Sequence, residues 1–135
     1  MPTPSPWKFF SVEELRCKCG CGAMNMNADF MEKMVKLRLH FGFPLIVTSA
    51  FRCPAWDAKV GSSARAGAGP HTTGHAMDIN VWGERGLVFV KKAVELGLFA
   101  GIGLMQKGET RGRFIHIDDL TEAEAIAPRP GLWTY

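Results

Sequence analysis

The sequence contains no long apolar run, no cluster of basic residues and no large charge imbalance. No apolar stretch approaches the roughly 20 residues that a membrane-spanning helix needs, so membrane insertion is not expected. The net charge is +3 over 135 residues, and the lack of a basic cluster argues against a nucleic-acid partner. The opening MPTPSPWKFF lacks the cationic start and apolar stretch of a signal peptide, so no such leader is expected.

The composition is that of an ordinary globular protein. Apolar residues make up 47% and charged residues 21%, which disfavours a disordered chain. The length suits one domain with one core, so we expect a single domain over residues 1–135, acting as a monomer.

Apolar spacing indicates both helices and strands. Residues 28–40 and 84–97 have helical periodicity, and Leu87, Val90 and Val94 in the second segment are spaced for one buried stripe. Four segments with β-branched runs or alternation are expected to be strands: 45–52, 75–82, 101–105 and 113–118. The tail from residue 121 is expected to pack as irregular structure. The sequence therefore predicts an α+β fold, with a small antiparallel sheet of about four strands packed against two main helices.

Histidine is scarce, and two of the four histidines fit a metal site together with one aspartate. In segments 75–82 and 113–118, the core would take the isoleucine and methionine side chains. Alternation then leaves Asp78 and His116 on the opposite face. If the strands are antiparallel neighbours, these residues lie side by side, and the preceding loop could deliver His71. Two imidazoles and a carboxylate suit zinc and leave a fourth position for water, as in catalytic sites.

Four cysteines form a second group of residues that could bind metal or form a disulfide: Cys17, Cys19, Cys21 and Cys53. The first three alternate in CKCGCG, and neighbours that close rarely bridge one another. A four-thiolate structural metal, one disulfide to Cys53 and free thiols all remain open, because structural zinc sites usually have longer spacing. A catalytic cysteine is the weakest interpretation, since no histidine lies nearby in sequence.

The segment HTTGHAMDI, residues 71–79, resembles the central motif S-x-H-x-x-G-x-A-x-D of a zinc-peptidase superfamily. That superfamily comprises D-alanyl-D-alanine carboxypeptidases and L-alanyl-D-glutamate endopeptidases, and it includes the hedgehog signalling domain. Gly69 stands at the serine position, and His75 stands where an arginine is often found. The matching residues are His71, Gly74, Ala76 and Asp78.

Other segments extend the resemblance over roughly residues 9–120. TSAFRCP resembles the family's S-G-Y-R-C-P and places Arg52, and in CPAWDAKVG Asp57 replaces the usual asparagine. FIHID resembles the strand with the third zinc ligand, at His116. The opening FSVEELRCKCGCG resembles the small single-domain branch found in phages and bacteria.

The resemblance implies a hedgehog/DD-peptidase-like fold and roles for individual residues. Zinc would be bound by His71, Asp78 and His116. Arg52 would hold the substrate carbonyl or carboxylate and stabilise the oxyanion.

The family also needs a carboxylate as general base, often three residues before the last histidine. Arg113 occupies that position here, so Asp118 is the first candidate and Glu109 the second, while Asp119 should face away. His75 and Trp82 are candidate substrate contacts, the latter because strand phase puts it on the face of Asp78.

The implied function is that of a zinc metallopeptidase, a hydrolase acting on peptidoglycan stem peptides. It would be a carboxypeptidase or an endopeptidase, serving as a bacteriophage endolysin or in cell-wall remodelling. We expect synthesis in the cytoplasm and action on the wall after phage release or export by another route. Two alternatives are a non-catalytic zinc-containing binding module, which the missing acid at Arg113 favours, and a phage structural component with the same fold.

Overall fold

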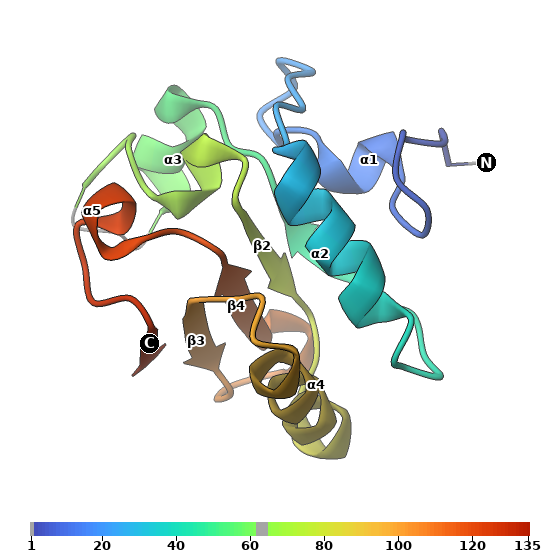
Figure 1. The fold of residues 1–135 in the computed structure, drawn as a ribbon. Coiled ribbons are helices and arrows are strands. Elements are labelled where there is room, and N and C mark those ends of the chain that lie inside the picture. Colours follow the sequence, from blue (N-terminus) through green and yellow to red (C-terminus); the bar gives the residue numbers. More distant parts are fainter. Residues whose placement is uncertain (1, 62–64) are drawn as a thin grey trace.

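A five-stranded sheet lies at the centre of the protein (Figure 1). The computed structural model describes residues 2–61 and 65–135. The strand order is β1-β2-β4-β3-β5. The strands are β1 (Val47–Ser49), β2 (Ala76–Ile79), β3 (Gly101–Met105), β4 (Phe114–Asp118) and β5 (Gly131–Thr134).

In residues 2–61 and 65–135, the sheet is accompanied by five α-helices and two 3-10 turns. The two longest helices are α2 (Ala28–Arg38) and α4 (Gly83–Leu96), as the apolar spacing predicts. The shorter elements are α1 (Val12–Leu15), α3 (Pro54–Val60), η1 (Pro70–Thr73), η2 (Thr110–Gly112) and α5 (Glu122–Ala125). None of the described helices is both long and apolar enough to cross a membrane.

The α+β fold class is confirmed, with one correction at the carboxyl end. Strands β1, β2, β4 and β3 pair antiparallel, but β5 adds a fifth strand parallel to β3. The prolines of the tail predict irregular structure. Those prolines precede the strand, and the following side chains alternate, with Leu132 exposed and Trp133 half-buried.

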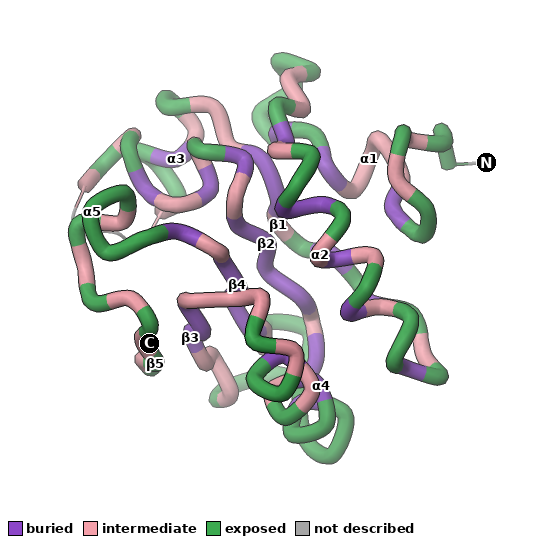
Figure 2. Tube along the Cα trace, viewed as in Figure 1, coloured by how far each residue is buried: buried purple, intermediate pink, exposed green. Residues whose placement is uncertain are grey.

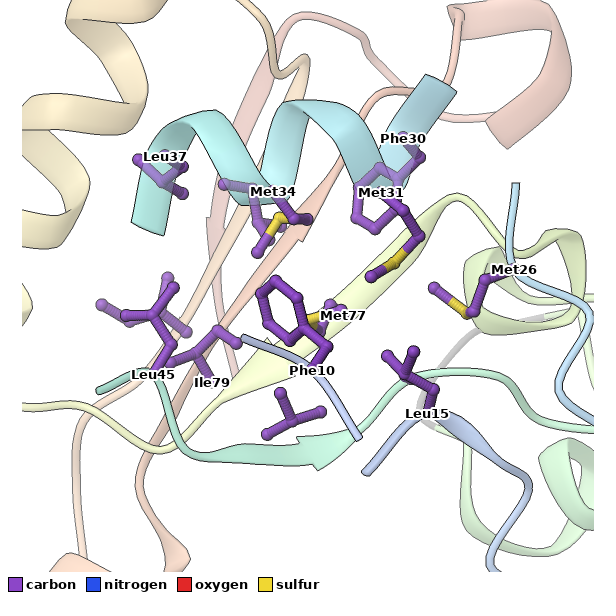
Figure 3. Close-up of a cluster of buried hydrophobic side chains, with 14 of the residues drawn as sticks. Phe10, Leu15, Met26, Phe30, Met31, Met34, Leu37, Leu45, Met77 and Ile79 are labelled. Atoms are coloured by element: carbon purple, nitrogen blue, oxygen red, sulfur yellow. The ribbon is translucent and has the colours of Figure 1, made fainter. Parts of the chain in front are cut away.

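The core lies between one face of the sheet and helices α1, α2 and α4. Figure 3 shows Phe30, Met34 and Leu37 of α2 directed toward Met77 and Ile79 of β2. Each such buried side chain stabilises the fold by about 1.5–3 kcal/mol. In Figure 2 the buried residues follow β2 and β4, whereas the outer turns of α4 are exposed.

The buried face of α4 differs from the predicted stripe. Leu87 and Val94 are 71% and 65% exposed, whereas Phe89 and Ala93 are buried. The ring of Phe89 stacks on Phe41 at a centroid distance of 5.7 Å. The buried face of the helix thus consists of one large ring between Gly86 and Ala93, which the spacing of aliphatic residues alone does not predict.

The register between β2 and β4 positions the functional face of the sheet. Asp78 lies opposite His116, and Met77 lies opposite Ile117. Because the methionine and isoleucine are in the core, the aspartate and histidine face the other side. Helices α3 and α5 lie on that side in Figure 1, away from α2 and α4.

Gly74 joins η1 to β2 and provides a test of this connection. It has φ +76, and a Cβ there would overlap the carbonyl oxygen of Asn25. The left-handed conformation alone costs an alanine about 1–2 kcal/mol. We expect Gly74→Ala to lower the free energy of unfolding by about 2 kcal/mol or more in urea titration.

The matched control is Gly42→Ala, since a Cβ at Gly42 has open space and the backbone conformation is ordinary. Its effect should stay within about 0.5 kcal/mol. Equal effects of the two substitutions would contradict the assigned constraint at Gly74.

Candidate metal centre

His71, Asp78 and His116 meet on the functional face of the sheet. They come from η1, β2 and β4, and all three are buried. Asp78 Oδ1 lies 3.2 Å from His71 Nε2 and 3.1 Å from His116 Nδ1. One ligand atom from each residue lies within 4.8 Å of the others. The structure thus brings together the three residues that strand phase and the motif predict.

Hydrogen bonds on the outer sides of the imidazoles determine which nitrogens are protonated. His71 Nδ1 is 2.7 Å from the carbonyl oxygen of Ala50, and His116 Nε2 is 2.7 Å from Asp118 Oδ2. Both oxygens only accept, so these nitrogens carry the protons. The remaining nitrogens, His71 Nε2 and His116 Nδ1, therefore direct lone pairs at Asp78, which also accepts. Three acceptors facing one point require a proton or a cation between them.

The ionisation of the group reflects the same requirement. Burial alone would raise the pKa of Asp78, but the imidazoles of His71 and His116 hold it well below its usual range. Burial would lower the pKa of His116, but the carboxylates of Asp118 and Asp78 raise it to about 9. In the absence of metal, the raised pKa of His116 favours a proton between His116 Nδ1 and Asp78 at neutral pH. Two imidazole nitrogens and one carboxylate form a donor set that fits zinc.

Asp118 lies behind His116 rather than in open space. Its side chain is fully buried and accepts from Arg129 Nε at 2.9 Å and Nη2 at 2.8 Å, besides His116 Nε2. A Cβ at Gly101 would come within 2.5–2.6 Å of the Asp118 oxygens and Arg129 Nε, so a glycine is needed there. Asp118 is therefore placed to orient the imidazole of His116, a role that carboxylates commonly have in zinc sites.

Arg52 is fixed beside the three candidate ligands. Its Nη1 lies 3.2 Å from Asp57 Oδ1, its Nη2 lies 3.5 Å from Asp78 Oδ2, and its Nε donates to Ser49 Oγ at 3.0 Å. Asp57 is buried and also accepts from Gly69 N at 3.0 Å. The motif indicates Asp57 only as a replacement for asparagine and does not reveal that it anchors Arg52.

The three residues open onto a cleft of about 1010 Å³. One wall is the carboxyl-terminal tail, where the Trp133 ring lies 5.3 Å from the His116 ring and 4.6 Å from the Arg129 guanidinium. A Cβ at Gly103 would clash with the Trp133 indole, so glycine at this β3 position admits the ring. In the sequence, the alternate positions of Trp133 and Tyr135 are the feature that could have indicated this wall, because alternate residues share one face of a strand.

The structure places two other candidate residues away from the cleft lining. His75 Nδ1 lies 2.7 Å from Asp119 Oδ1, and Lys33 binds the other oxygen of Asp119, which faces away from the cleft as expected. Trp82 borders a separate hollow of about 360 Å³. Its expected place in the cleft is corrected because β2 ends at Ile79, so strand phase does not extend to residue 82.

Glu109 also lies outside the cleft lining. Its side chain is 76% exposed and pairs with Arg111 at 2.9 Å. It precedes η2, whose last residue, Gly112, does line the cleft. The turn that begins at Glu109 therefore reaches the cleft lining at Gly112.

Comparison with known families gives a match over most of the chain. A family model described as peptidase M15 matches residues 8–118, a range that includes the three candidate ligands. Neither the curated proteins nor the solved structures contain a match to the chain.

Removal of a candidate ligand tests the metal centre directly. His71→Ala or His116→Ala should each abolish one equivalent of bound zinc, because two remaining ligands hold zinc weakly. Elemental analysis of purified protein measures this. His40→Ala is the matched control, since His40 is exposed at the end of α2 and should leave zinc content unchanged. Full retention of zinc by either ligand variant would rule out the site.

The role of Asp118 predicts an effect on metal affinity. Asp118→Asn weakens the acceptor for His116 Nε2 and should lower zinc affinity about 10–100-fold in a chelator competition. Glu109→Gln should leave the affinity unchanged, because Glu109 contacts none of the ligands. Equal affinities of the Asp118 variant and the wild type would contradict the positioning role.

Proposed function

The chain belongs to the peptidase M15 family, and on this premise we propose that it is a zinc-dependent peptidase that hydrolyses peptide bonds in peptidoglycan stem peptides. The observation that carries the proposal is the convergence of His71, Asp78 and His116 at a cleft. Members of the family are zinc-dependent, and the donor set fits that metal. The site of action would be the bacterial cell wall, in lysis or remodelling, and the net charge of +3 would favour approach to an anionic wall polymer.

The residues of the site would have separate roles in such a reaction. When bound, zinc supplies Lewis acidity, which polarises a peptide carbonyl and lowers the pKa of water. Ala50 and Asp118 hold the two imidazoles in the tautomers that expose lone pairs to the metal. Arg129 forms an ion pair with Asp118, so the buried carboxylate stays ionised and is not left unpaired.

Arg52 is suited to bind the substrate. A guanidinium has five N–H donors, and Ser49, Asp57 and Asp78 engage one each among the described residues. The remaining donors can bind a substrate carbonyl or a terminal carboxylate at the cleft. Because Asp57 and Ser49 fix the side chain, this binding requires little further loss of side-chain entropy.

The tail gives the cleft an apolar wall. Leu132, Trp133 and Tyr135 line it, together with Phe114 of β4. Small methyl side chains, such as the alanines of a stem peptide, can pack against these surfaces. The cleft volume suits a short extended peptide rather than a single amino acid.

We assign proton transfer to Glu109 and orientation of His116 to Asp118. Both oxygens of Asp118 are engaged in the interior, so it is poorly placed to accept a proton from water. The surface ion pair of Glu109 with Arg111 is worth roughly 0–1 kcal/mol, so rotation of the Glu109 side chain toward the cleft costs little.

Glu109→Gln should therefore lower kcat on peptidoglycan by about 10²–10⁴-fold while zinc content stays at the wild-type level. Release of new amines from purified peptidoglycan measures the rate, and elemental analysis measures the zinc. Glu122→Gln is the matched control, since Glu122 is also exposed and does not line the cleft. An undiminished rate for the Glu109 variant would exclude it as general base.

A second candidate function is a zinc-containing binding module without catalysis. It is favoured by one observation: the carboxylates that line the described part of the cleft, Asp57 and Asp78, are both engaged. Such a module would bind peptidoglycan and release no product.

Mass spectrometry of muropeptides after digestion separates these functions. Loss of one terminal alanine would identify a D,D-carboxypeptidase, and a cut between alanine and glutamate would identify an endopeptidase. His71→Ala should produce neither. If the zinc-loaded wild-type protein releases no more product than His71→Ala, the peptidase proposal fails.

A further inference from the structure

The four cysteine sulfurs form a second cluster, which shares no residue with the group of His71, Asp78 and His116. One ligand atom from each of Cys17, Cys19, Cys21 and Cys53 lies within 4.8 Å of the others. The Sγ atoms of Cys17 and Cys19 are 3.5 Å apart, and those of Cys19 and Cys53 are 3.7 Å apart. A disulfide requires about 2.05 Å. Four sulfurs around zinc at about 2.3 Å lie about 3.8 Å apart, which the observed separations approach.

Two glycines allow alternate cysteines to face one point. Gly20 and Gly22 have φ +95 and +79, and a Cβ at either position would meet no atom within 4 Å. These glycines are therefore needed for backbone conformation rather than for space. A hydrogen bond from Cys17 N to the Ala23 carbonyl, at 2.7 Å, closes the loop. The loop thus compensates for a spacing shorter than that of usual zinc motifs.

Backbone N–H groups point at the sulfurs. Cys53 N donates to Cys17 Sγ at 3.3 Å, and Cys21 N donates to Cys19 Sγ at 3.4 Å. Such donors stabilise thiolates, the form of cysteine that binds metal.

We propose that Cys17, Cys19, Cys21 and Cys53 bind a second zinc ion with a structural role. Four thiolates are soft ligands that select zinc over hard cations. Four protein ligands leave no position for water or substrate, so the site is closed.

The proposed ion would stabilise the segment that carries Arg52. Cys17 lies just after α1, and Cys53 precedes α3 at the residue after Arg52. Phe51 N donates to the Leu15 carbonyl at 3.1 Å, so the two segments already lie side by side. A metal link between them would join the amino-terminal region to the helix that presents Asp57.

Zinc stoichiometry tests the proposal independently of peptidase activity. The wild-type protein should bind two equivalents, and both Cys53→Ser and His71→Ala should bind one. Lys18→Ala, in the same loop but without loss of a thiol, is the matched control and should bind two. Two equivalents of zinc in Cys53→Ser would overturn the proposal. The zinc equivalent that is lost in His71→Ala bears only on the proposed function.

Cobalt substitution and thiol reactivity keep the test valid if Cys53→Ser folds poorly. Cys21→Ser alters an exposed side chain. The cobalt-substituted Cys21→Ser protein should lose the thiolate charge-transfer band, and the cobalt-substituted His71→Ala protein should keep it. In the zinc-loaded wild type, thiols should react with a thiol reagent only after a chelator is added. Immediate reaction of the exposed Cys19 and Cys21 would show free thiols, and reaction only after a reductant would show a disulfide; either result overturns the proposal.

Discussion

The antiparallel register of β2 with β4 is the constraint on which the site depends. It sets Asp78 opposite His116 and, on the reverse face, Met77 opposite Ile117. A slip of one residue would exchange the faces and bury the ligands among the helices. The packing of α2 and α4 on the apolar face therefore fixes the metal centre, although neither helix contributes a ligand.

The carboxyl-terminal tail supplies the remaining contacts of the candidate metal centre. Arg129 holds Asp118, and Asp118 in turn orients His116, so a residue outside the central strands controls a ligand imidazole. Trp133 then covers the same imidazole from β5. Glycines at 101 and 103 provide the space for this layer. The cleft wall and the orientation of the ligand thus come from one segment.

The sequence predicts the site well where the information is local. Alternation within each strand and a compact motif suffice to place Asp78, His116 and His71 together. The tail was not predicted, because β5 pairs with β3 across distant sequence and its prolines suggest irregular structure. Trp82 was misplaced for a related reason: where a strand ends depends on the following helix, which alternation does not reveal.

The most direct test of the central claim is anomalous X-ray scattering at the zinc edge from crystals of the zinc-loaded protein. We expect a peak about 2.0–2.1 Å from His71 Nε2 and from His116 Nδ1, with Asp78 as the third ligand. Binding through His71 Nδ1 or His116 Nε2, or no peak between these side chains, would contradict the assigned metal centre.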